Sequence, residues 1–125
     1  MTLSYSDKVF RNLFLGFIRL HILYHAQKEP VFGLNIMIEL ERHGYKMSPG
    51  TLYPILHQME NGGLLRSEYC VSNCKRRKYY RLTEEGKQAL AQSYEKIEEL
   101  SDELNEPSYE PIAHRLATAG EDVDK

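Results

Sequence analysis

Four polar side chains near the middle of the chain are of the types that contact nucleic acid. Thr51 and Tyr53 carry hydroxyl groups, and Gln58 carries an amide that can read the edge of an adenine. Lys46, a few residues earlier, can pair with a phosphate. Together they predict contact with double-stranded DNA from one helix face, and the alternative is an ordinary solvated face.

The charges of this chain are unevenly distributed along it. The formal net charge is -2, yet residues 46–81 hold seven basic and two acidic residues, a local charge of +5. Residues 83–104 hold two basic and seven acidic residues, a local charge of -5. One segment can therefore attract phosphate while another repels it. The densest basic run either neutralises several phosphates or is a solvated charged segment. It consists of Lys75, Arg76, Arg77 and Lys78.

Two cysteines and two histidines have spacings that permit other chemistry. Cys70 and Cys74 are close enough for a redox-active disulfide or a shared metal, and the alternative is a pair of ordinary reduced thiols. Two thiols alone do not complete a zinc site. His21 and His25 lie one helical turn apart, which permits metal binding, although such pairs are more often structural or exposed. The sequence assigns no metal and no cofactor.

Three helices are expected to position these residues. Apolar residues at intervals of three and four predict a first helix through Phe10–Tyr24. A second helix is expected at about 33–43, with Gly44 in a left-handed cap. The third helix is expected at about 48–61. It carries Thr51, Tyr53 and Gln58, and Lys46 lies just ahead of it. Ser48 is its expected N-cap, because serine is favoured at that position.

A hairpin and a last helix are expected to follow. Strands at 65–70 and 77–82, joined by a loop at 71–76, form a basic wing at about 65–82. Tyr79 and Tyr80 are interpreted as strand residues, one packed inward and one along the wing, rather than as stacking partners for bases. A helix at 83–104 carries an apolar stripe with nearly heptad spacing, supported by Leu100, and this stripe is interpreted as a dimer contact. The stripe consists of Leu90, Tyr94, Ile97 and Leu104.

These elements predict a mainly α-helical chain with a small β-hairpin. Residues 1–82 are expected to form a winged helix-turn-helix domain, 83–104 a C-terminal dimerisation helix, and 105–125 a flexible acidic tail. The chain carries no glycine-rich phosphate loop, nucleophile motif or metalloprotease pair, so we expect no enzymatic activity. It also shows no membrane-spanning segment and no cleavable leader, and we expect a cytoplasmic location.

Two stretches resemble the signature of the PadR-like transcriptional regulators. The first is Ser48-Pro49-Gly50-Thr51-Leu52-Tyr53-Pro54, followed by Leu56-His57, Glu60 and Gly63-Leu64. The second is Arg77-Lys78-Tyr79-Tyr80-Arg81-Leu82-Thr83, with Gly86 three positions on. The matching stretches span roughly residues 13–104, and their combined spacing is far more specific than either motif alone. The cysteine pair and the tail after Pro107 have no counterpart in that signature.

The resemblance implies a homodimer in which the first and last helices contact the partner, in the manner of the subgroup with one C-terminal helix. It also implies that Thr51 and Tyr53 touch DNA and that Ser48 binds a phosphate. The aromatic residues of the first helix, together with Tyr94, then either line a pocket for a small-molecule effector at the dimer centre or form the dimer and domain core. The helix residues are Phe10, Phe14, Phe17 and Tyr24.

The function expected from the sequence is sequence-specific transcriptional regulation. A homodimeric repressor would bind a pseudo-palindromic operator and be released by a small-molecule, metal or redox signal. The alternative from another class is a winged-helix module that binds a protein partner, with the basic wing against an acidic surface.

Overall fold

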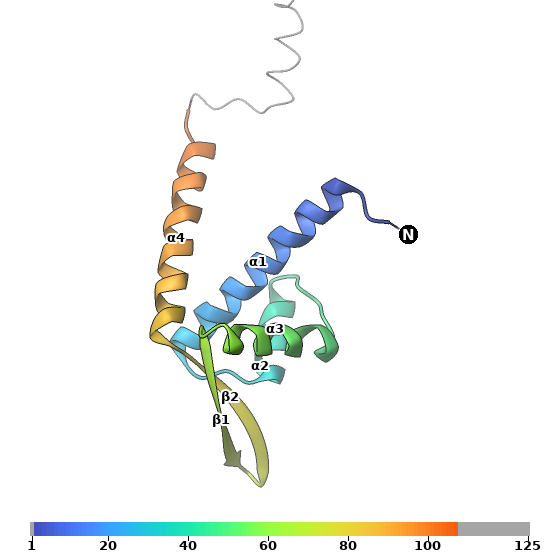
Figure 1. Ribbon diagram of the computed structural model, residues 1–125, viewed down its shortest axis with the longest axis vertical. Coiled ribbons are helices and arrows are strands. Elements are labelled where there is room, and N and C mark those ends of the chain that lie inside the picture. Colours follow the sequence, from blue (N-terminus) through green and yellow to red (C-terminus); the bar gives the residue numbers. More distant parts are fainter. Residues whose placement is uncertain (1, 108–125) are drawn as a thin grey trace, which may run out of the picture. The chain divides into compact units, whose positions relative to one another are not determined.

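The computed structural model describes residues 2–107 of the chain, without the side chain of Ser72. It contains four helices and one antiparallel hairpin (Figure 1). This confirms the expected fold class, which is mainly helical with a small β-hairpin. Of the predicted acidic tail, the part from 108 onward lies outside the described residues. In chain order the elements are α1 (Tyr5–Lys28), α2 (Gly33–Arg42), α3 (Pro49–Asn61), β1 (Leu65–Ser72), β2 (Lys75–Leu82) and α4 (Glu84–Leu104).

Local signals in the sequence explain the helix ends. Ser4 caps α1, because its Oγ accepts a hydrogen bond of 3.1 Å from the backbone N–H of Asp7. At the start of α2, Oδ1 of Asn35 accepts a 2.8 Å hydrogen bond from the backbone N–H of Phe32. After α2, Gly44 has a φ of +89°, which is the left-handed conformation expected from the sequence.

The core lies between the first three helices and the base of the hairpin. Val31, in the segment between α1 and α2, exchanges two backbone hydrogen bonds with Tyr80 of β2, at 3.0 and 2.7 Å. This bridge fastens the second wing strand to the helices. The buried apolar residues are Ile18, Ile22, Leu23, Ala26, Val31, Ile36, Leu40, Leu52, Ile55, Leu56, Met59, Leu65 and Tyr80.

The hairpin is longer than the sequence indicated. The strands pair from Leu65 with Leu82 out to Ser72 with Lys75, so the loop expected at 71–76 is a two-residue turn. Its residues, Asn73 and Cys74, have φ values of 51° and 63°, as in the type I′ turns that fit the twist of a hairpin. The prediction of a six-residue loop was wrong, because the outer hairpin is exposed and therefore shows no apolar alternation.

The last helix is joined to the hairpin through a threonine cap. Thr83 accepts a 3.0 Å hydrogen bond from the backbone N–H of Gly86 and donates one to the carbonyl oxygen of Gly63, as a helix N-cap should. The first compact unit of the chain ends at Ser93 within α4, and the second begins at Tyr94. None of the helices in the described part of the chain has the length and apolar character needed to span a membrane.

Candidate nucleic-acid interface

Helix α3 has one buried face and one exposed polar face. Its apolar side faces the core with Leu52, Ile55, Leu56 and Met59. Thr51, Tyr53 and Gln58 are exposed, as is Lys46 ahead of the helix. The three α3 residues that the sequence singled out for DNA contact are therefore all accessible, with Lys46 just ahead of the helix.

The ring of Tyr53 rests against the first residue of α2. Tyr53 is 40% exposed, and a Cβ atom added to Gly33 would lie 2.3 Å from its hydroxyl oxygen and 2.6 Å from Cζ. Such distances are far inside van der Waals contact, so only a glycine at position 33 leaves room for the ring. Gly33 is thus a positioning residue for Tyr53. Sequence reasoning missed this role, because the two residues are brought together only by the packing of α2 on α3.

The N-terminus of α3 presents two hydroxyl groups. Ser48 occupies the N-cap position with extended backbone, and the hydroxyl groups of Ser48 and Thr51 lie 3.4 Å apart. Ser48 makes no side-chain capping bond, so the expectation of a hydroxyl cap was wrong in that detail. Both side chains are exposed at the end of the helix where the partial positive charge of the dipole favours a phosphate.

The four basic residues of the wing lie along the half of β2 that is nearer the turn, beginning with Lys75 directly after it. Lys75 and Arg76 are exposed, and the guanidinium group of Arg76 lies 4.0 Å from the centre of the Tyr69 ring. Arg77 is partly buried with its guanidinium 4.4 Å from the centre of the Phe32 ring. The aromatic contacts hold these long side chains in place while leaving a line of positive charge along one strand.

Glu60 in the last turn of α3 connects the helix to both wing strands. It accepts a short hydrogen bond from the hydroxyl of Ser67 on β1, and its carboxylate lies 3.6 Å from Nζ of Lys78 on β2. The Ser67 hydrogen bond, assisted by the charge of Lys78, lowers the pKa of Glu60 although partial burial opposes this. Lys78 is therefore engaged within the chain, unlike Lys75, which lies at the exposed end of the strand.

The two wing tyrosines have different surroundings. Tyr80 is 1% exposed and belongs to the core, whereas Tyr79 is half-buried with its ring edge-on to Phe32, 5.3 Å between centres. This confirms the interpretation of one residue packed inward and one along the wing.

Both cysteines are free and exposed. Cys70 lies on β1 opposite Arg77, and Cys74 is the second residue of the turn. Neither belongs to the one group of three or more metal-ligating side chains found among residues 2–107. A redox or metal role for the pair remains a prediction.

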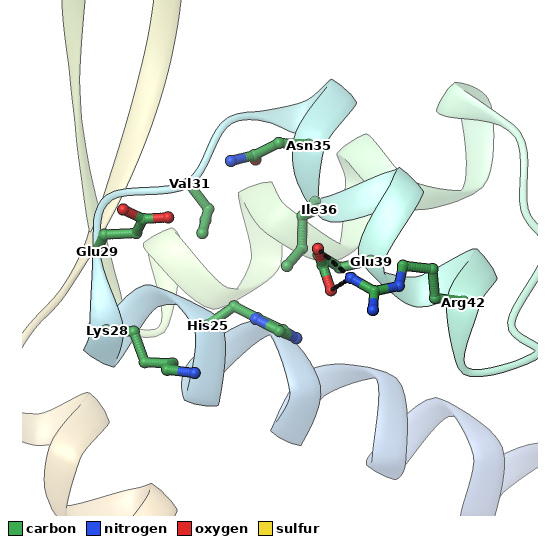
Figure 2. A pocket seen from close by; sticks show the side chains of 8 residues that line it. All are labelled: His25, Lys28, Glu29, Val31, Asn35, Ile36, Glu39 and Arg42. Atoms are coloured by element: carbon green, nitrogen blue, oxygen red, sulfur yellow. Dashed lines mark hydrogen bonds and ion pairs between the residues drawn. The ribbon is translucent and has the colours of Figure 1, made fainter.

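The aromatic residues of α1 are mostly on its surface. Phe10, Phe14 and Tyr24 are exposed, while Phe17 is half-buried. Phe14 borders a shallow pocket of about 250 Å³, which is completed by Ile18 and residues 44–47. A larger pocket of about 460 Å³ lies between the end of α1 and α2 and is mainly polar, with an Arg42–Glu39 ion pair of 3.2 Å in its wall (Figure 2).

The apolar stripe expected on the last helix divides into two parts. Leu90 is half-buried and packs against the core of the first unit, so part of its surface is already covered within the chain. Tyr94, Ile97 and Leu104 are exposed, as is Leu100 between them. An apolar helix face without a partner in a single chain is typical of an interface with another chain.

Three helices, a two-stranded wing, and an exposed polar face on the third helix define a winged helix-turn-helix protein. The transcriptional regulator PadR-like family model matches residues 22–92, which is more than half of the chain. The chain belongs to this family, whose members are DNA-binding transcription regulators and not enzymes.

Individual proteins that this chain resembles are also described as transcription regulators. The chain is 48% identical over 87 residues to the transcriptional regulator Rv3488 of Mycobacterium tuberculosis, covering 70% of this chain and 81% of that protein. A solved PadR-like transcription factor from Bacteroides fragilis is 31% identical, with a TM-score of 0.69 and coverage of 79% of this chain and 97% of that one. A PadR family regulator from Clostridium difficile is 30% identical, with a TM-score of 0.67 and coverage of 71% and 95%.

Proposed function

We propose that this chain is a homodimeric repressor that binds a pseudo-palindromic operator. The main observation that supports DNA binding is the exposed face of α3, with Thr51, Tyr53 and Gln58, together with the basic strand β2. In a winged helix such a face enters the major groove and contacts base edges, while the wing contacts the phosphate backbone. Lys46 and Ser48 would hold phosphates at the N-terminal end of α3. Occupation of a promoter in the cytoplasm then blocks transcription.

The homodimer is supported by two exposed apolar helix faces. On α1 the exposed large apolar residues include Val9, Phe10, Leu13 and Phe14, and on the second half of α4 they include Tyr94, Ile97, Leu100 and Leu104. Exposed apolar helix faces in a small chain favour association with an identical chain. Two copies would carry two α3 helices to two half-sites about one turn of DNA apart.

We propose that a small-molecule or redox signal releases the protein from its operator. A small molecule could bind beside Phe14 in the pocket completed by residues 44–47, directly ahead of α3. Oxidation of the exposed pair Cys70 and Cys74 would act on the wing itself. Either signal releases the DNA only if it favours a dimer geometry that does not bind the operator. The small molecule must bind that geometry better, or the oxidised cysteines must form more readily in it.

The DNA proposal is tested by selecting bound fragments from sheared genomic DNA and titrating the best fragment at two salt concentrations. We expect one enriched palindromic site. Tyr53→Ala should weaken its binding by about 1–3 kcal/mol, which is roughly 5- to 150-fold. Lys75→Ala should weaken binding to all sequences and reduce the salt slope by about one unit. Lys87→Ala, which removes an equivalent exposed charge from α4, is the matched control.

Absence of any enriched site, with equal weak binding to every polyanion, would overturn this proposal in favour of a protein-binding winged helix. The dimer is tested separately by sedimentation of Ile97→Asp and Leu104→Asp, both at exposed positions. Monomers are expected, and a persistent dimer would refute this interface.

A further inference from the structure

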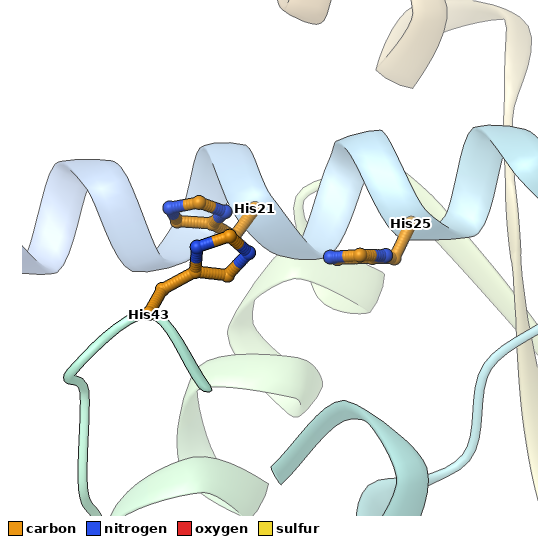
Figure 3. A group of neighbouring side chains, drawn as sticks. All are labelled: His21, His25 and His43. Atoms are coloured by element: carbon orange, nitrogen blue, oxygen red, sulfur yellow. The ribbon is translucent and has the colours of Figure 1, made fainter. Parts of the chain in front are cut away.

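Three histidines from two helices gather at one place in the first unit (Figure 3). His21 and His25 lie one turn apart on α1, and His43 is the C-cap residue of α2. Each offers a ring nitrogen, and these nitrogens all lie within 4.8 Å of one another. The ring of His21 is stacked on that of His43, with 4.5 Å between centres and 25° between planes.

One ring nitrogen of His25 lacks a partner. Nε2 of His25 is buried and makes no hydrogen bond within the described part of the chain. A buried polar atom without a partner is costly, so most such atoms in proteins are satisfied by protein, water or an ion. His25 also lines the polar pocket of Figure 2.

The surroundings of His21 and His25 favour the neutral imidazole, which is the form that coordinates metals. Burial lowers the pKa of His21, and the neighbouring His43 and His25 lower it further. Burial also lowers the pKa of His25, although the carboxylate of Glu39 partly opposes this. The positive charge of Arg42 near the cluster is balanced by its ion pair with Glu39.

We propose that His21, His25 and His43 form a binding site for a borderline divalent transition metal of the zinc, cobalt and nickel class. Three imidazole nitrogens and one water complete a tetrahedral site, with bonds of about 2.0–2.1 Å that place the nitrogens roughly 3.3 Å apart. Starting from separations of at most 4.8 Å, the nitrogens need to approach by no more than about 1.5 Å, and the rings need to turn out of their present stack. His43 is exposed and can rotate to do so. Magnesium and calcium are excluded, since they prefer oxygen ligands.

A metal here would connect α1 to the end of α2. Residues 44–48 follow His43 directly and lead into α3, so the bound ion would fix the start of the segment that carries Lys46 and Ser48. The site itself does not depend on the proposed repressor function, and its binding test uses no DNA.

The test uses the full chain, stripped with a chelator and titrated with Co²⁺ alone. We expect one Co²⁺ per chain, visible absorption bands typical of tetrahedral cobalt, and displacement by Zn²⁺. The melting temperature should rise with metal, because an ion that binds only the folded state stabilises it. His43→Ala removes an exposed ligand and should weaken binding by at least about tenfold, since even indirect changes around metal sites cost that much. His21→Ala should do the same.

Two controls separate this site from other metal binding. His57→Ala removes an exposed histidine of α3, and the double change Cys70→Ser with Cys74→Ser removes both thiols; both variants should bind Co²⁺ as the wild type does. Circular dichroism in chelator verifies that each variant is folded, and His43→Gln provides a second, polar replacement. Failure of the wild type to bind, unchanged affinity in folded His43→Ala and His43→Gln, or loss of binding in the cysteine variant would overturn the proposal.

Discussion

The contact between Gly33 and Tyr53 allows a sharp test of how the DNA-contacting face is built. Replacing Gly33 with alanine places a methyl carbon 2.3, 2.6 and 2.7 Å from three atoms at the end of the Tyr53 side chain. Ordinary contact begins near 3.4 Å, so the ring must move by about 1 Å or more. Because the ring is partly exposed, it can swing toward solvent rather than force the helices apart.

The magnitudes follow from opposing effects on stability. Overpacking of this kind costs about 1–3 kcal/mol, and the better helix propensity of alanine returns up to about 1 kcal/mol. We expect Gly33→Ala to lower the free energy of unfolding by about 1 kcal/mol in urea denaturation. In a chain that already carries Tyr53→Ala the clash is absent, so the same change should be neutral or stabilising. The coupling energy between the two positions should then be about 1–2 kcal/mol.

Operator binding provides the second measurement. Displacement of the ring should make Gly33→Ala nearly as harmful to affinity for the selected operator as Tyr53→Ala, about tenfold, and the double variant should be no worse. Gly16→Ala is the matched control for stability, because a Cβ at Gly16 has no atom within 4 Å. Additive stability changes, or full operator affinity in Gly33→Ala while Tyr53→Ala loses it, would refute the reasoning.

Three further predictions concern stability. Gly86→Ala should destabilise the chain by about 2–3 kcal/mol in urea denaturation, because its Cβ would lie 2.3 Å from a backbone carbonyl oxygen that cannot move like a side chain. Cys74→Gly should stabilise the hairpin by up to about 1 kcal/mol, since Cys74 has a φ of 63° that glycine adopts freely, and an unchanged or lower melting temperature would contradict this. The lowered pKa of Glu60 means that its contacts stabilise the fold above the pKa of an unfolded glutamate, and that this stability is lost as the pH falls through the folded pKa. In pH titrations of stability, Glu60→Gln should therefore show a smaller loss on acidification than the wild type, and an identical profile would count against the assignment.

The residues that the sequence located best are those with local signals. The periodic apolar residues of α3 and its flanking Ser48 and Gly62 define the helix and its exposed face without any tertiary information. The cap of α4 is equally local, because Thr83 accepts its hydrogen bond from the backbone N–H of Gly86, three residues further on. Such features depend on neighbours within about four positions, which the sequence shows directly.

What the sequence could not show depends on contacts between distant segments. His43 joins His21 and His25 only because α2 packs along α1, and the pair alone gave no reason to include it. The outer ends of the two wing strands were missed because Val71, Lys75 and Arg76 are all exposed there, so no alternation of buried apolar residues indicates a strand. The conformation of the turn at Asn73 and Cys74 follows from the twist of the hairpin, although cysteine is an unusual residue for it.

The contacts of Glu60 explain why α3 and the wing are expected to bind DNA as a unit. Its carboxylate contacts Ser67 on β1 and Lys78 on β2, so one side chain in the last turn of α3 connects the helix to both strands. A helix that reads base edges gains specificity only if phosphate contacts hold it in one register. In the proposed complex, Lys75 and Arg76 would supply such contacts from the same strand that carries Lys78. The acidic residues of α4 repel phosphate, which disfavours docking through that helix and leaves the α3 and wing surface as the favoured face for DNA.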